Sequence, residues 1–226
     1  MEGLPSTGTD SLITRPMLLT GVAAPLLYAF TVVWGATLFP GYNHLAEPIS
    51  SLTQAGREGA ANLDGLFFIY NVLVIAYGIS GISLSPRRRY WIASFSFLIA
   101  TGFAGLLMWL FRQDAVGSTV TLTGVVHIGL AAVTSLGSIG AIGAAILACR
   151  GRPELRPLRL FSLACLVIVF VSGGLAALGI GSGWSYAGLL ERITIGAFEL
   201  WLFVVAGTLL ARAIAARMPY SSRSGV

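Results

Sequence analysis

The stretch FPGYNHLAEPISSLTQAGREGAANLDG, residues 39–65, is the only long polar segment between the hydrophobic runs of this sequence. One apolar run, 17–39, precedes it, and another, 65–84, follows it. A helix rises 1.5 Å per residue, so about 20 apolar residues cross the roughly 30 Å hydrocarbon core of a bilayer. We therefore interpret residues 40–64 as a loop between two membrane-spanning helices, and expect recognition or chemistry to take place there.

The rest of the chain repeats this apolar pattern. Of its 226 residues, 56% are hydrophobic and only 10% are charged, whereas soluble domains are about 25% charged. No region shows the alternating polarity of outer-membrane strands. The sequence thus predicts an all-α polytopic membrane protein, with a bundle of six transmembrane helices in residues 15–213, a disordered tail at 1–14 and a second tail at 214–226. The six expected spans are 17–39, 65–84, 91–111, 123–148, 158–180 and 189–211.

Arginine placement predicts how this bundle is oriented. All fourteen basic residues are arginine; eleven lie on the side of the chain ends, and Arg57, Arg112 and Arg192 lie on the other side. Because cytoplasmic loops carry the excess of positive charge, we expect both termini in the cytoplasm and the 40–64 loop outside. Arginines beside helix ends face anionic lipid headgroups, which explains the net charge of +5 without a nucleic-acid partner.

The long loop itself carries a helical pattern. Ile49, Leu52 and Ala55 recur at helical spacing, which predicts a short interfacial helix lying on the bundle. Ser50 or Ser51, which follow a proline, are expected to cap it.

Polar residues continue from the loop side into the membrane. Glu199 lies ten positions past the start of the last span, about 15 Å deep, where a carboxylate is costly unless it is paired, protonated or hydrated. Arg192 precedes it by seven positions, on the same helical face. Asp64 and Asn71 have the same spacing, so the face that they share is expected to point into the bundle.

Short polar motifs occur along nearly the whole chain. They are Tyr42-Asn43-His44, Ile49-Ser50-Ser51-Leu52, Gly56, Gly59, Asn62, Arg112-Gln113-Asp114, His127 and Glu191-Arg192. Together they resemble the bacterial domain-of-unknown-function 998 family. The resemblance implies six transmembrane helices and a shared polar cluster on the outer face, without an established activity. With the charge bias, it leads us to expect a bacterial plasma membrane protein.

The leading functional hypothesis is an outward-facing polar pocket that binds or handles a lipid or small amphiphile. Membrane lipids are its expected partners, and no cofactor is expected, since phosphate loops and haem-attachment motifs are missing. A proton-coupled transporter with Glu199 as its protonatable site is a variant. The residues expected to line the pocket are His44, Glu47, Asp64, Asn71, Asp114, His127, Arg192 and Glu199.

Two other classes of function stay open. A membrane-embedded enzyme acting on a lipid or envelope precursor would use His127 as general base and Asp114 to orient it, with Ser50 as the nucleophile of a triad. A non-catalytic assembly or regulatory subunit would instead use the 40–64 loop to contact a protein partner.

A metal site is not expected. Two histidines are too few for a three-histidine zinc site, and the separations between the ligand residues match no metal-binding motif. The side chains that such a site would have to use are His44, Glu47, Asp114, His127 and Glu199.

Overall fold

The computed structural model describes residues 10–85, 88–115 and 118–215, and this described part contains helices and no strands. Six of its helices are long and apolar enough to cross a membrane. This confirms the predicted six-helix architecture. In chain order the elements are α1 (Asp10–Thr37), η1 (Ile49–Thr53), α2 (Ala60–Ser83), α3 (Arg89–Met108), α4 (Leu122–Ala148), η2 (Pro153–Leu155), α5 (Arg156–Ser182) and α6 (Ala187–Ala215), with η marking a 3-10 helix.

The helix bounds differ most from the predicted spans at α1. This helix begins at Asp10, so residues 10–14, which we expected in a disordered tail, are helical. Hydropathy detects only the part of a helix that crosses the hydrocarbon core, and the apolar run begins at 17. Several positions of the predicted tails and loops lie outside the described residues: 1–9, Arg87, Arg217, Arg223 and the rest of 216–226.

The short helix expected in the long loop is present as η1. Ile49 and Leu52 are buried, as the helical spacing predicts, whereas Ala55 is exposed. Pro48 occupies the N-cap position in an extended conformation, and no side chain caps the helix. The predicted serine cap is therefore wrong, because the chain enters the helix directly at the proline.

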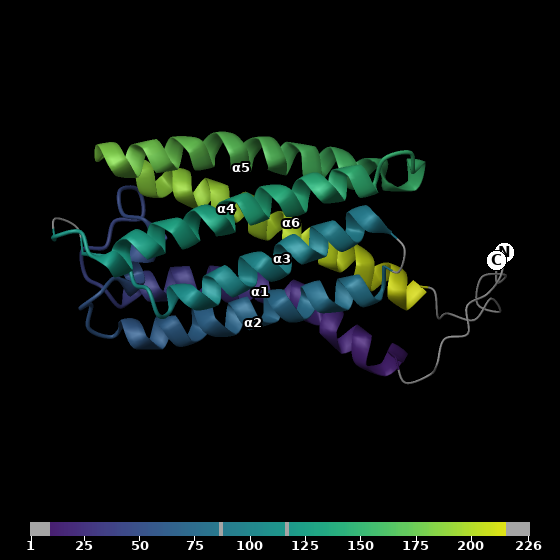
Figure 1. Ribbon diagram of the computed structural model, residues 1–226, viewed down its shortest axis with the longest axis horizontal. Helices are drawn as coiled ribbons and strands as arrows, with labels where there is room; N and C mark the ends of the chain where they lie inside the picture. The colour runs from purple at the N-terminus through teal and green to yellow at the C-terminus, as the bar shows by residue number, and fades with distance from the viewer. Residues whose placement is uncertain (1–9, 86–87, 116–117, 216–226) are drawn as a thin grey trace.

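The six long helices run alternately in opposite directions, side by side (Figure 1). Each packs against the next one along the chain, and α6 also packs against α1. We call the end where α1 begins and α6 ends the terminal end. The opposite end, where α1–α2, α3–α4 and α5–α6 are connected, is the loop end. That the terminal end faces the cytoplasm stays a prediction from the arginine bias.

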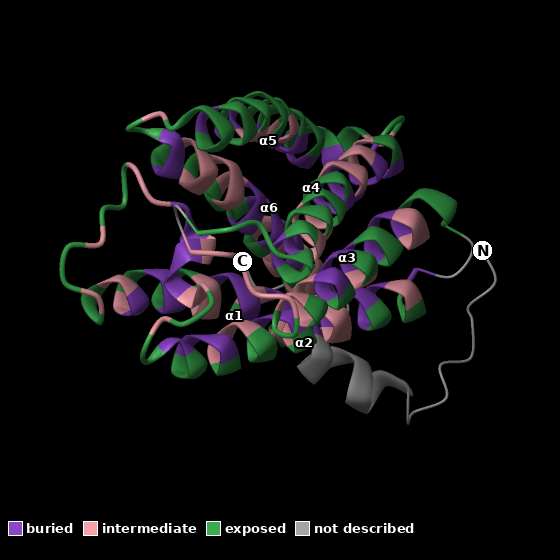
Figure 2. Cartoon of the chain, turned by 60° about the vertical axis from the view of Figure 1, so that its left-hand side comes forward, coloured by how far each residue is buried: buried purple, intermediate pink, exposed green. Residues whose placement is uncertain are grey.

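Burial separates lipid-facing from inward-facing sides of the helices. Large apolar side chains such as Ile128 and Phe170 are exposed, and Figure 2 shows exposed positions along the outward face of α5. Inside, the fully buried Trp201 donates its indole N–H to Ser162 Oγ at 3.0 Å. Lipid is as apolar as leucine, so packing and buried hydrogen bonds hold such helices together. The chain is an integral membrane protein.

Small residues allow the closest helix contacts. A β-carbon at Gly105 of α3 would collide with the side-chain amide of Asn71 in α2, and one at Gly137 of α4 would collide with Thr101 of α3. Ser94 of α3 also donates to a carbonyl oxygen of α4 at 2.8 Å. The neighbours of α3 are therefore fixed by glycine spacing, as the glycine-rich spans indicate.

Candidate functional site

One arginine fastens the long loop to the start of α6. Arg192 donates from Nη1 to the carbonyl oxygens of Glu47 and Gly188, both at 2.8 Å, and from Nε to His44 Nδ1 at 3.2 Å. Its Nη2 donates to the hydroxyl of Tyr42. Four of the five guanidinium N–H donors are thereby used within the chain. Arg192 thus acts first as a clamp on the loop.

Two further hydrogen bonds beside Arg192 hold the same loop against α6. Glu191 Oε2 accepts the backbone N–H of Ile49 at 2.6 Å, and the N–H of Leu189 donates to the carbonyl oxygen of Leu45 at 2.9 Å. The result is that η1 lies on the bundle in contact with α1, α2 and α6. Residues 42–53 form a fixed cap at the loop end, which we call the cap.

The electrostatics of the cap favour neutral side chains around Arg192. Burial raises the pKa of Tyr42, and the Arg192 charge offsets part of that rise. Burial lowers the pKa of His44, and the positive charge of Arg192 lowers it further. The imidazole is therefore neutral at pH 7, which leaves Nδ1 available to accept the Arg192 hydrogen bond.

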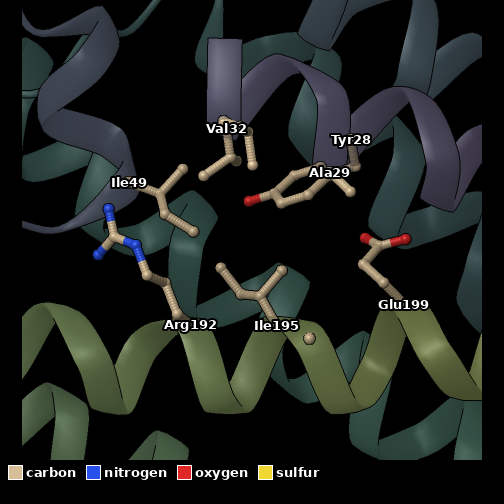
Figure 3. Close-up of a pocket in the computed structure, with 9 residues that line it drawn as sticks. Tyr28, Ala29, Val32, Ile49, Arg192, Ile195 and Glu199 are labelled. Carbon is tan, nitrogen blue, oxygen red and sulfur yellow. The ribbon is translucent and has the colours of Figure 1, made fainter. Parts of the chain in front are cut away.

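Beneath the cap, a groove of about 170 Å³ runs between α1 and α6 (Figure 3). Ile49 of η1 closes its end at the cap, and Glu199 lies at its opposite, deep end. Val33, Ala29 and Gly196 are exposed on its rim, so the groove opens sideways, at the outer surface of the bundle. The full lining is Tyr28, Ala29, Val32, Val33, Ile49, Arg192, Ile195, Gly196 and Glu199.

Glu199 brings an incompletely paired carboxyl group into this apolar groove. Its side chain is only 7% exposed, and Oε1 accepts the hydroxyl of Tyr70 at 2.5 Å. The other oxygen, Oε2, is buried and has no hydrogen-bond partner among the described residues. In Figure 3 the carboxyl group points from α6 towards Tyr28 of α1, whose ring lies across the groove. The Tyr28 ring meets the Tyr70 ring edge-on, with centroids 4.9 Å apart.

Residues 22–208, from within α1 to within α6, match the family model of a protein of unknown function, DUF998. The chain belongs to the DUF998 family. The match confirms the resemblance seen in the sequence motifs. No curated protein and no solved structure matches the chain. Because the family description names no activity, the function of this DUF998 protein rests on the geometry of its site.

Two of the predicted pocket residues face α3 instead of the groove. Asp64 and Asn71 are buried on α2, as their spacing predicts. Asp64 pairs with Arg112, the one salt bridge found in the described part of the chain. Asn71 donates to the carbonyl oxygen of Phe67 at 2.8 Å and packs on Gly105. Both side chains therefore stabilise the contact of α2 with α3 and its following segment.

Asp114 and His127 lie at a third place, the α3–α4 connection. Asp114 accepts the backbone N–H of Thr121 at 2.9 Å and its hydroxyl at 2.6 Å, and these bonds lower the pKa of Asp114. His127 Nδ1 lies 2.8 Å from the carbonyl oxygen of Phe111, to which a proton on that nitrogen is donated. Ser50 belongs to η1, against α1, α2 and α6. The groups of the hypothetical triad thus have separate partners.

The predicted site residues are distributed over three places: the cap with the groove below it, the contact of α2 with α3, and the α3–α4 connection. His44, Glu47 and Arg192 meet in the cap, and Glu199 lies below them in the groove. Within the described ranges, no three His, Cys, Asp or Glu side chains gather as metal ligands would. Sequence reasoning missed Tyr28 and Tyr70. Their signal is a tyrosine well inside a span, since membrane tyrosines are enriched at the interfaces.

Proposed function

We propose that this DUF998 protein binds an amphiphile in the groove between α1 and α6. The observation that carries the proposal is Glu199 Oε2, a buried oxygen without a partner in the described part, at the end of a largely apolar groove. An unsatisfied buried polar group costs about 1–3 kcal/mol. A ligand that supplies the missing hydrogen bond at Oε2 removes this cost and gains affinity.

The groove is large enough to hold one end of an amphiphile, but it is too small for a whole drug-sized ligand. Its volume of about 170 Å³ is below the roughly 300–1,000 Å³ of pockets for drug-sized ligands. A cavity of about 150 Å³ holds one benzene molecule. The polar head and the first few carbons of a chain therefore fit inside, while the rest of the chain extends into the bilayer.

The residues that line the groove also favour an amphiphile as its ligand. Val32, Ile49 and Ile195 offer apolar contacts, and the rim at Val33 is exposed on a helix that is apolar enough to cross a membrane. The cap closes the end of the groove at Ile49. Because the groove is closed at the cap and open at its side, a ligand enters it from the bilayer instead of from water.

Gly196 makes a groove-blocking variant possible. A β-carbon placed there meets no atom within 4 Å, so Gly196→Leu adds apolar bulk at the rim of the groove, which Gly196 lines, without a backbone clash. Gly174 of α5 is an exposed helical glycine with the same empty surroundings. Because Gly174 lies outside the groove, Gly174→Leu is the matched control for added apolar bulk.

The test is photolabelling of the purified protein in phosphatidylcholine nanodiscs with dodecanol that carries a diazirine near its hydroxyl group. We expect labelling of α1 and α6 peptides that unlabelled dodecanol suppresses. Gly196→Leu should reduce this saturable labelling by about tenfold, a loss of about 1.4 kcal/mol in binding, and Gly174→Leu should leave it unchanged. Labelling that never saturates, or that Gly196→Leu does not reduce, would refute the proposal.

A further inference from the structure

We propose that the head group received at Glu199 is a primary or secondary ammonium, so that the ligands are alkylamines or amine-bearing lipids. This inference rests on the proposed function and names its ligand class. Glu199 Oε2 accepts hydrogen bonds when the carboxyl group is ionised, and it is buried beside the groove without a donor from the described residues. An ammonium supplies both the missing N–H donor and the missing positive charge.

The described surroundings of Glu199 contain no counter-ion for an ionised carboxylate. Tyr70 of α2 offers a neutral hydroxyl, and Tyr28 of α1 offers a neutral ring. The one salt bridge in the described part joins Asp64 and Arg112. A carboxylate in the membrane is costly unless it is paired, so a cationic ligand is the partner that most lowers its free energy.

Arg192 does not occupy this role. It lies seven residues before Glu199 on α6, about 10 Å along the helix axis. Its guanidinium binds Tyr42, His44 and two carbonyl oxygens at the cap end of the groove. The deep end is left with a carboxyl group that has no cationic partner among the described residues, and the arginine at the cap end is already hydrogen-bonded within its own chain.

Aromatic rings complete the ammonium site. The Tyr28 ring lies across the groove next to the carboxyl group (Figure 3), and the Tyr70 ring packs edge-on against it. The face of an aromatic ring attracts a cation within about 6 Å. An ionised carboxyl group beside a tyrosine ring favours an ammonium over a hydroxyl, and it repels a carboxylate head.

The experiment uses the photolabelling assay with three unlabelled competitors of equal chain length: dodecylamine, dodecanol and dodecanoate. Each is added to the full chain in phosphatidylcholine nanodiscs at the same mole fraction in the bilayer, so that partitioning does not enter. We expect dodecylamine to compete about tenfold better than dodecanol, equivalent to about 1.4 kcal/mol, and dodecanoate to compete least. Glu199→Gln, which keeps the shape and removes the charge, should abolish the preference while dodecanol still competes.

The outcomes separate the two proposals. Saturable labelling with equal competition by amine and alcohol in the wild type overturns the ammonium inference and leaves amphiphile binding standing. A preference for dodecanoate, or an amine preference that persists in Glu199→Gln, also overturns it. Labelling that no competitor suppresses overturns both. The comparison of competitors in the wild-type protein decides the inference even where the variant fails to fold.

Discussion

Tyr70 of α2 donates its hydroxyl to Oε1 of Glu199 in α6, a bond between two buried side chains that are 129 positions apart in the sequence. This bond fixes which carboxyl oxygen is satisfied, and thereby leaves Oε2 to the groove. Because Glu199 lines the groove and Tyr70 does not, the tyrosine is a positioning residue. The packing of α2 thus controls a site built between α1 and α6.

Removing the Tyr70 hydroxyl should weaken binding more than it weakens the fold. Membrane hydrogen bonds average about 0.6 kcal/mol, and bonds to charged groups reach about 1.5–3 kcal/mol. We expect Tyr70→Phe to reduce competition by dodecylamine about three- to tenfold, with a small change in thermal unfolding midpoint. Tyr77→Phe is the control in the same helix, since its hydroxyl is buried with no partner in the described part. Equal effects of the two variants would contradict the positioning role.

Arg192→Lys should loosen the cap. Lysine cannot reproduce the planar fork that reaches four acceptors, so the amide hydrogens of Ile49 and Leu189, bonded at the cap, should exchange about tenfold faster or more, a change of at least about 1.4 kcal/mol in local opening. Hydrogen exchange with mass spectrometry measures this. Arg212→Lys, at the terminal end, is the control. Unchanged protection of both amides in Arg192→Lys would show that the cap is held by other contacts.

The Asp64–Arg112 pair predicts that removing Arg112 alone destabilises the protein more than replacing both residues together. Asp64 is buried and Arg112 is one-third exposed. Removing Arg112 leaves a buried charge uncompensated, which costs about 3–5 kcal/mol for fully buried pairs, and the solvent exposure of Arg112 reduces this to about 2 kcal/mol. The double variant Asp64→Asn with Arg112→Gln should recover much of this loss. Free energies of unfolding in mixed micelles test it, and additive losses would contradict the pairing.

His44 gives the cap a pH dependence. The pKa of His44 is lowered in the folded protein, so its neutral form contributes stability that is present above the ordinary value of about 6.5. This stability is lost as the pH falls through the lowered pKa, because a protonated Nδ1 cannot accept from Arg192. We expect protection of the Ile49 amide, corrected for intrinsic exchange, to fall as the pH is lowered below about 6.5. In His44→Gln the change should be smaller; an equal change would assign it to another group.

Much of the fold follows from the sequence, and less of the site does. The lengths of the apolar runs predict six helices, and counting along the last span places Glu199 deep in the membrane, where it is found buried. Depth along one helix can be counted, but the neighbours of a helix depend on packing between helices. Topology placed Asp114 and His127 on the same side as Arg192 without showing that α3 and α4 hold them apart from α6. The Tyr70 partner of Glu199 depends on the same lateral arrangement.

The most direct test of the central claim is an experimental structure of the protein purified with its native lipids. The proposed function predicts elongated non-protein density in the groove between α1 and α6, with its polar end beside Glu199 Oε2 and Tyr28. Its tail should leave past Gly196 towards the bilayer. A groove that is closed by direct packing of α1 on α6, with Oε2 satisfied by a protein group, would contradict the claim.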